Sequence, residues 1–192
     1  MKTRLTARHA KHAERIVLCA FCVLCGCFVP ASRLVAQTGP VIVVDTTKGI
    51  FEIETYPNEA PKTVAHVVGL VAQRFYDRQR VHRAVPGFVV QWGDPRSRDT
   101  SDSTEWGLGP DASSGTPIGA AEITRKRLPT KGAVAIAHQG IPAQGDSQIF
   151  VTLADRPDLN GKYAVFGRVV TGEDVPGRLE RGDLIRRMYL KE

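Results

Sequence analysis

Short β-type runs separated by turns make up most of the chain, and this division strongly limits the folds that it can adopt. The runs lie at residues 41–44, 50–55, 81–85, 88–92, 132–137, 148–153, 163–170 and 184–190. Apolar residues recur at helical spacing over residues 61–74, and a second, short helix is expected at 173–180. Many short strands with two helices favour a β-barrel or sandwich over a βαβ fold.

The first two runs predict a β-hairpin that leads into the longer helix. Residues 50–55 alternate apolar and polar side chains, and residues 45–49 form the expected turn before them. In the next segment, Asn58 is a candidate helix cap and Pro61 suits the first helical turn. Residues 94–119 are polar and rich in Gly, Ser and Asp, so they predict a loop, and a loop of this length is often functional.

The N-terminal region has the layout of a secretory signal peptide. A positively charged stretch at residues 1–15 precedes an uncharged run at 16–32, and small or aliphatic residues follow up to Ala36. Cleavage after Ala36 would leave residues 37–192 as one exported domain, periplasmic or extracellular. The uncharged run is slightly shorter than the roughly 20 residues of a spanning helix, so a retained membrane anchor is the alternative.

All four cysteines lie inside the uncharged run, which supports export. Cleavage would remove them and leave a protein without cysteine, as suits an oxidising compartment. Residues 24–27 also resemble a weak bacterial lipobox, and lipidation at Cys27 would instead give a membrane-anchored lipoprotein. Contact with a membrane is therefore expected only through a retained anchor or a lipid at Cys27.

The charge of the chain argues against a nucleic-acid partner. The formal net charge is +6, but residues 1–36 contain six basic residues and one acidic residue. The rest of the chain has 20 basic and 19 acidic residues, a net charge of +1. A nearly neutral body lacks the basic surface that binds phosphate backbones.

Three segments of the body carry a resemblance to a known family. They read VHRAVPGFVVQWGD at 81–94, GAVAIAHQGIPAQGDSQIFVTL at 132–153 and PDLNGKYAVFGRVVTG at 157–172. In this order they resemble the motifs of cyclophilin-type peptidyl-prolyl cis–trans isomerases, and the leader suggests a bacterial-like, exported member. The resemblance implies a closed eight-stranded antiparallel β-barrel capped by two α-helices, with the active site on an outer face. It also implies a monomer that needs no metal or other cofactor.

The activity that the resemblance implies is rotation of X-Pro bonds in peptides and unfolded proteins. Arg83 would carry the catalysis, because twisting the amide localises a lone pair on the prolyl nitrogen, to which a guanidinium can donate. The remaining implied catalytic residues are Phe88 and Gln91. The implied substrate-binding residues are Val89, Ala137, His138, Gln148, Phe150, Leu159 and Tyr163. The alternative is a non-catalytic module of the same fold that binds proline-containing peptides or acts as a chaperone.

Each implied residue has a part. Phe88, Val89, Phe150 and Leu159 would form the proline pocket, with Tyr163 at its rim. Gln91 and Gln148 would hold the substrate backbone and orient Arg83, and the edge at Ala137 and His138 would pair with that backbone.

Several residues depart from the family pattern. Asp158 stands where many members have a Trp that is associated with cyclosporin, so weak cyclosporin binding is expected. Trp92 replaces a Gly, and by strand parity it faces away from Gln91 and should affect packing. His138 replaces an Asn, and the loop after it is one residue longer. His82 has the opposite parity to Arg83 and is expected to be structural.

Overall fold

The expected hairpin begins the part of the chain that the computed structural model describes, residues 39–109 and 111–192. Its strands are β1 (Val41–Thr46) and β2 (Gly49–Thr55), which pair in antiparallel register with Val44 opposite Phe51. Both strands extend into the predicted five-residue turn and leave only two residues between them. The turn closes because Gly49 adopts φ +132°, a conformation that side-chain-bearing residues rarely adopt.

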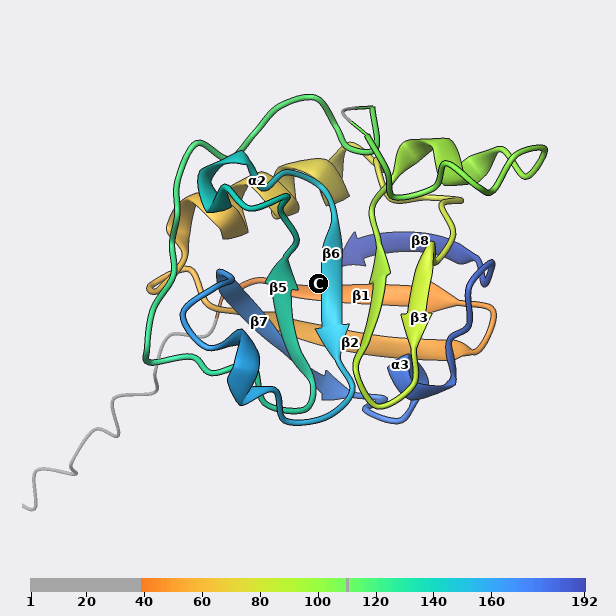
Figure 1. The fold of residues 1–192 in the computed structure, drawn as a ribbon. Helices are drawn as coiled ribbons and strands as arrows, with labels where there is room; N and C mark the ends of the chain where they lie inside the picture. The colour runs from red at the N-terminus through yellow and green to blue at the C-terminus, as the bar shows by residue number, and fades with distance from the viewer. Residues whose placement is uncertain (1–38, 110) are drawn as a thin grey trace, which may run out of the picture. The chain divides into compact units, whose positions relative to one another are not determined.

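The remaining elements follow in the predicted order (Figure 1). They are α2 (Pro61–Ala72), β3 (Arg83–Val85), β4 (Val89–Trp92), β5 (Ala133–Ile136), β6 (Ile149–Thr152), β7 (Val165–Thr171), α3 (Val175–Arg178) and β8 (Ile185–Leu190). Three single 3-10 turns lie in the loops, at η1 (Pro95–Arg98), η2 (Pro142–Gln144) and η3 (Pro157–Leu159). The predicted strands are thus all present, and most are shorter than the apolar runs that predicted them.

The eight strands form one curled antiparallel sheet in the order β3-β4-β6-β5-β7-β2-β1-β8. The expectation of a closed barrel is wrong, because no ladder joins the end strands β3 and β8 and the sheet is a half-barrel. Within the described residues, the segments next to these strands are joined by an isolated bridge between Arg80 and Leu184 and by single backbone hydrogen bonds, among them those from the Arg78 N–H to the Ile185 carbonyl and from the Val81 N–H to the Asp183 carbonyl. Arg78 has φ +64°, which interrupts an extended backbone and prevents a regular ladder.

The helix α2 is capped from a distance. Asn58 does not cap it, and the residue at the N-cap position makes no side-chain hydrogen bond. The carboxylate of Glu122 instead accepts hydrogen bonds from the Lys62 and Thr63 N–H groups, at 3.0 and 2.8 Å. A residue from the segment that precedes β5 thereby satisfies two of the free N–H groups of the first turn.

The other end of α2 is a Schellman motif with an arginine at the left-handed position. Arg74 has φ +58°, its N–H donates to the Val71 carbonyl, and the Phe75 N–H donates to the Leu70 carbonyl. Because this geometry ends the helix at Ala72, α2 is two residues shorter than the spacing of its apolar residues predicts.

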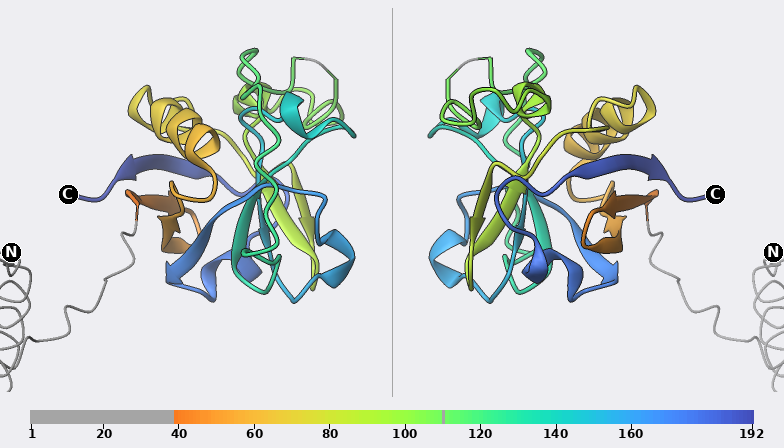
Figure 2. Two further views of the ribbon diagram at one scale, coloured as in Figure 1. Left: turned by 90° about the vertical axis from the view of Figure 1, so that its left-hand side faces the viewer. Right: turned by 90° about the vertical axis from the view of Figure 1, so that its right-hand side faces the viewer.

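Alternation along the strands produces two separate apolar clusters. The larger one contains the inward side chains of the sheet and the buried face of α2. Figure 2 shows α2 running alongside β8, with which it is in contact. The smaller cluster lies on the outer face and includes Val89, Ala135 and Phe150. The predicted second helix is a single turn, α3, because Leu179 returns to an extended conformation, so it caps the sheet only locally.

Candidate functional site

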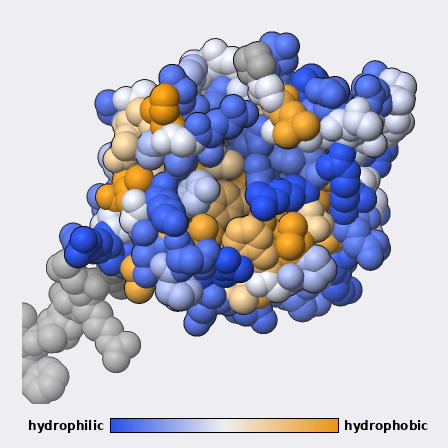
Figure 3. All heavy atoms as spheres, in the orientation of Figure 1, coloured by the Kyte–Doolittle hydropathy of each residue, from blue (hydrophilic) through white to orange (hydrophobic). Residues whose placement is uncertain are grey.

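A small cavity lies over the outer apolar cluster, bordered by β3, β4, β6 and η3. Its volume is about 120 Å³. Figure 3 shows apolar side chains gathered in a hollow on this face, with hydrophilic side chains around it. The structure brings together nine of the ten predicted site residues here: Arg83, Phe88, Val89, Gln91, Ala137, His138, Phe150, Leu159 and Tyr163.

Strand pairing explains why these residues meet. Arg83 lies opposite Gln91, and Gln91 lies opposite Phe150, so three neighbouring strands present their side chains to one face. Ala135 pairs with Phe150 on the other side, and its small side chain leaves room above β5. The result is an apolar floor at Val89 and Phe150 with a polar edge at Arg83 and Gln91.

Phe88 reaches the cavity through a turn. It lies just before β4, where Gly87 has φ +69° and the Phe88 N–H donates to the Val85 carbonyl at 2.9 Å. The turn rotates its ring out of the strict alternation of β4, as the sequence would require for a pocket residue.

Arg83 is exposed at the cavity edge, and no ion pair or side-chain hydrogen bond of Arg83 occurs within the described residues. Its guanidinium carbon lies 5.3 Å from the centre of the Phe88 ring. Neither Gln91 nor Gln148 contacts it by a hydrogen bond. The guanidinium donors are therefore available to a bound molecule, and the two glutamines do not orient them here.

Gln148 lies next to the cavity instead of lining it. Its Oε1 accepts a hydrogen bond from Gln91 Nε2 at 2.7 Å, and its own Nε2 donates to the Ala112 carbonyl at 2.8 Å. It lines a neighbouring cavity of about 520 Å³ that shares Gln91, Ala137 and His138 with the first one. Gln148 thus links the site to the long loop.

At Ala137 and His138, the edge that was expected to pair with a substrate backbone, one backbone group already makes a hydrogen bond within the protein. The Ala137 N–H donates to the Gln148 carbonyl at 2.9 Å, which leaves the carbonyl of Ala137 for a ligand. The His138 ring is fixed by a 2.8 Å contact of Nε2 with the Lys162 carbonyl and lies 4.7 Å from the Tyr163 ring. Tyr163 in turn meets Phe150 edge-on at 5.1 Å, so these rings form one continuous wall.

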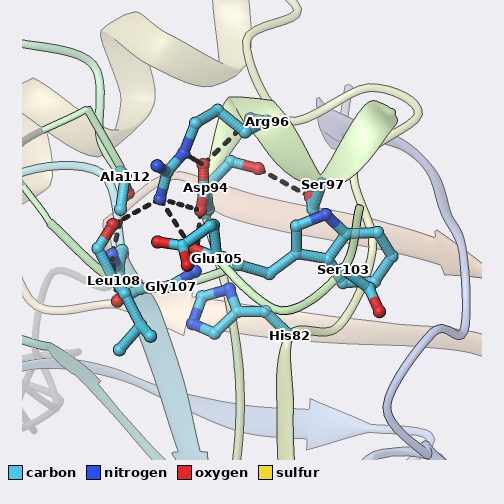
Figure 4. A network of polar contacts seen from close by, with 12 residues as sticks. His82, Asp94, Arg96, Ser97, Ser103, Glu105, Gly107, Leu108 and Ala112 are labelled. Atoms are coloured by element: carbon cyan, nitrogen blue, oxygen red, sulfur yellow. Dashed lines mark hydrogen bonds and ion pairs between the residues drawn. The ribbon is translucent and has the colours of Figure 1, made fainter. Parts of the chain in front are cut away.

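A polar network that the sequence did not suggest fixes the long loop beside the site (Figure 4). The fully buried Asp94 accepts hydrogen bonds from the Gly107 N–H at 2.7 Å and from Arg96 Nη2 at 3.0 Å. Arg96 also donates to the Glu105 and Leu108 carbonyls. One buried carboxylate and one guanidinium therefore hold the first residues of the loop segment that borders the larger cavity.

A second carboxylate, Asp146, connects that cavity to α2. It accepts a hydrogen bond from Ser114 and lies 2.9 Å from His66 Nε2. Burial alone would raise the pKa of Asp146, but the hydrogen bonds from His66 and Ser114 bring it below its usual value. Asp146 is therefore ionised at neutral pH and tethers the loop to the helix.

His82 is buried beneath the same loop, which agrees with its expected structural part. Neither ring nitrogen has a hydrogen-bond partner among the described residues, and Gly107 packs on the ring. A Cβ at Gly107 would lie 2.6 Å from the His82 ring, so only glycine fits. Burial lowers the pKa of His82 to about 4 and keeps the ring neutral.

Acid should therefore destabilise the protein through His82. The unfolded chain binds a proton at this histidine below pH about 6.5, whereas the folded protein binds it only near pH 4. The contribution of the neutral His82 ring to the free energy of unfolding is complete above pH 6.5. It decreases by about 3 kcal/mol in total as the pH falls toward 4. Urea unfolding between pH 7 and 4 should show this slope, and His82→Gln should flatten it. An unchanged slope in the variant would contradict the assignment.

Two of the departures from the family pattern, Trp92 and Asp158, lie in different surroundings. Trp92 is fully buried in the larger core, where its Nε1 faces the Met188 sulfur at 3.3 Å. Asp158 is exposed beside the cavity and accepts two hydrogen bonds from Arg156. The Arg156 guanidinium lies 4.1 Å from the centre of the Phe88 ring. Nothing in the sequence motifs points to Arg156.

The described residues contain no group of three or more His, Cys, Asp and Glu side chains that could hold a metal ion. Within residues 39–109 and 111–192, no helix has both the length and the apolar character needed to cross a membrane. The predicted signal peptide, anchor and lipidation site at Cys27 lie outside the described residues.

Comparison with known proteins gives a consistent picture. A family model described as cyclophilin type peptidyl-prolyl cis-trans isomerase/CLD matches residues 41–189. The chain is 33% identical over 147 residues to peptidyl-prolyl isomerase CWC27 of Cryptococcus neoformans, covering 77% of this chain and 28% of that protein. It is 35% identical over 143 residues to peptidyl-prolyl cis-trans isomerase CYP57 of Arabidopsis thaliana, covering 74% and 27%.

A crystal structure of a Cryptosporidium parvum cyclophilin type isomerase has a TM-score of 0.67 at 21% identity. It covers 80% of this chain and 98% of that one, and it supports the fold. The chain spans less than a third of the length of the curated relatives that it matches.

The comparisons correct one expectation. Another relative, 36% identical over 134 residues and covering 70% of this chain and 26% of that protein, is the spliceosome-associated protein CWC27 homolog of Xenopus laevis. Spliceosome-associated relatives contradict the prediction of a periplasmic or extracellular protein. They also lend no support to a bacterial-like member, because these relatives come from eukaryotes. The charge pattern of residues 1–36 resembles a leader, but it does not establish export.

Proposed function

The chain belongs to the cyclophilin-type peptidyl-prolyl cis-trans isomerase family, and from this premise we propose that the 120 Å³ cavity is the active site of a prolyl isomerase. The observation that carries the proposal is the position of the Arg83 guanidinium, which has no ion-pair partner among the described residues, at the edge of a small apolar pocket. The substrates are X-Pro bonds in peptides and unfolded proteins.

The pocket suits a proline ring. Val89 and Phe150 provide a buried apolar floor, and Phe88 and Leu159 pack against the same cluster as partly buried walls. Transfer of a saturated ring from water to such a surface lowers the free energy, and the ring needs no polar partner there. Burial of the ring holds one side of the X-Pro bond while the preceding residue turns.

Arg83 supplies the part of the reaction that distinguishes the transition state. Rotation about the X-Pro bond disrupts amide resonance, and the prolyl nitrogen becomes a hydrogen-bond acceptor only as the bond twists. A guanidinium N–H aimed at that nitrogen therefore binds the twisted state more strongly than either planar state. This difference in binding is what lowers the barrier.

One hydrogen bond does not account for a fast enzyme. A ten-thousand-fold acceleration needs about 5.4 kcal/mol, whereas a charge-assisted hydrogen bond contributes about 1.5–3 kcal/mol. The remainder must come from the orientation of the substrate and from exclusion of water around Arg83. The rings of His138, Tyr163 and Phe150 line the same cavity as Arg83, and a substrate that packs against them would be oriented there and would displace water from the cavity.

A second candidate is a binding module that recognises proline segments without catalysis. It is favoured by the relatives that are named as spliceosome-associated proteins, since a domain within an assembly needs affinity more than turnover. A proline-limited refolding assay on the protein separates the two. Acceleration by the wild type that is lost in Arg83→Ala supports the enzyme, and peptide binding without acceleration supports the module.

Cyclosporin should bind this protein weakly. Asp158 places an exposed carboxylate, paired with Arg156, where many family members have a Trp. An apolar cyclic peptide would have to desolvate this ion pair. Asp158→Trp should strengthen binding about tenfold or more in a calorimetric titration. Nanomolar affinity of the wild type would refute the prediction.

A further inference from the structure

The ring of Phe88 needs support on its solvent side. Its backbone is fixed, because its N–H donates to the Val85 carbonyl at 2.9 Å and its carbonyl accepts from the Leu153 N–H at 2.8 Å. Its side chain, however, is only partly buried against the outer apolar cluster. A half-exposed aromatic ring can change rotamer unless something packs over it.

Arg156 provides that packing. Its guanidinium carbon lies 4.1 Å from the ring centre, well within the range of a cation–π contact. Its backbone is held at both ends, since its N–H donates to the Pro129 carbonyl at 2.9 Å and its carbonyl accepts from the Leu159 N–H at 3.0 Å. The Arg156 side chain therefore extends toward Phe88 from a backbone position that two hydrogen bonds fix.

Asp158 fixes the orientation of the guanidinium. Its carboxylate accepts from Arg156 Nε at 2.8 Å and from Nη2 at 2.7 Å, a bidentate fork that lysine cannot form. The hydrogen bond from Arg156 lowers the pKa of Asp158, so the fork is intact at neutral pH.

The ion pair also has an electrostatic consequence. Arg83 contacts the same ring at 5.3 Å, so two guanidiniums lie around one aromatic side chain. Asp158 offsets the charge of Arg156, whereas no carboxylate among the described residues forms an ion pair with Arg83. The positive potential at the pocket edge is therefore concentrated on the one guanidinium that faces the substrate.

We infer that Arg156, oriented by Asp158, is a positioning residue that holds the Phe88 ring as a wall of the proline pocket. This inference rests on the proposed function of the pocket. Arg156 does not touch the reacting bond. Its loss should weaken binding of ground state and transition state alike, so KM should rise while kcat changes little.

The test compares Arg156→Leu with a matched control, Arg127→Leu. Arg127 also stacks on a ring and pairs with a carboxylate outside the pocket lining, with its guanidinium carbon 3.7 Å from the Tyr56 ring centre and a single hydrogen bond from Nη2 to Glu59 Oε1 at 3.1 Å. The assay uses the full-length protein with an Ala-Pro tetrapeptide as substrate. Arg156→Leu should raise the KM for this peptide about two- to fivefold, and Arg127→Leu should leave it unchanged. Arg156→Lys should restore only part of the loss, because lysine lacks the fork.

A double-mutant cycle tests whether the effect passes through Phe88. In a Phe88→Leu background, Arg156→Leu should have no further effect on KM. If it costs the same factor there, or if Arg156→Leu matches Arg127→Leu, the inference is overturned.

Two further readouts separate this inference from the proposed function. If the wild type binds the peptide without isomerising it, the Kd of the peptide replaces KM in the same comparison. In 13C-phenylalanine-labelled protein, Arg156→Leu should shift the Phe88 ring resonances and Arg127→Leu should leave them in place. Unchanged Phe88 resonances in Arg156→Leu would refute the inference that Arg156 holds the Phe88 ring, even if no peptide binds.

Discussion

Replacement of Arg83 by alanine is expected to lower kcat/KM for X-Pro isomerisation by about 10- to 100-fold, the equivalent of one charge-assisted hydrogen bond. The side chain is exposed and makes no side-chain hydrogen bond with the described residues, so its removal leaves no buried group unsatisfied. What is lost is a donor that acts in the twisted state, and kcat should fall with KM nearly unchanged. Proline-limited refolding and NMR exchange of an X-Pro peptide would measure the loss.

The matched control for this prediction is Arg178→Ala. Arg178 is an exposed arginine in an ion pair with Asp174, and it lies on α3, outside the pocket lining. Its removal should leave kcat/KM unchanged. If Arg83→Ala retains wild-type activity, catalysis by a guanidinium at the prolyl nitrogen is refuted for this protein.

Replacement of Trp92 by alanine is expected to destabilise the fold by about 3–5 kcal/mol. The Trp92 ring is fully buried, meets Phe51 edge-on with ring centres 6.1 Å apart, and contacts Met188 through its indole nitrogen. Its loss would leave a large cavity at the centre of the larger apolar cluster. For a domain of this size the melting temperature should fall by roughly 10 °C.

Urea unfolding of Trp92→Ala beside Trp106→Ala gives the comparison. Trp106 lies in the long loop, donates to the Asp99 carbonyl and is nearly buried, but it belongs to neither apolar cluster. Its replacement should cost distinctly less. Equal losses, or a loss below 1 kcal/mol for Trp92→Ala, would contradict the assignment of Trp92 to the core.

The strands were predictable because apolar and polar residues alternate along them, whereas the grouping of the pocket residues was predicted from the resemblance to the cyclophilin motifs. Val89 and Gln91 share one parity and Trp92 has the other, so the sequence separates pocket from core without knowledge of the pairing. Phe88 was the exception, and Gly87 at φ +69° supplies the turn that it needs. Parity and the turn are local, but the pocket also needs Phe150 and Leu159 from distant segments, which the family motifs and not the local pattern pointed to.

The features that the sequence did not predict depend on contacts between distant segments. The open edge of the sheet arises where left-handed Arg78 meets the start of β8. The Glu122 cap and the Arg156–Phe88 contact likewise each join a loop to an element far away in the chain. A rotamer that is set by a distant partner leaves no periodic signal, so only the folded structure reveals it.

The open edge of the sheet also makes the heat stability of the proposed active site differ from that of the whole fold. Arg83 belongs to the end strand β3, a three-residue strand that pairs with β4 alone. Such a strand can detach in a local fluctuation that costs much less than global unfolding, because the large core under α2 stays packed. On heating, the proposed isomerase activity would therefore be lost at a lower temperature than the one at which the whole protein unfolds.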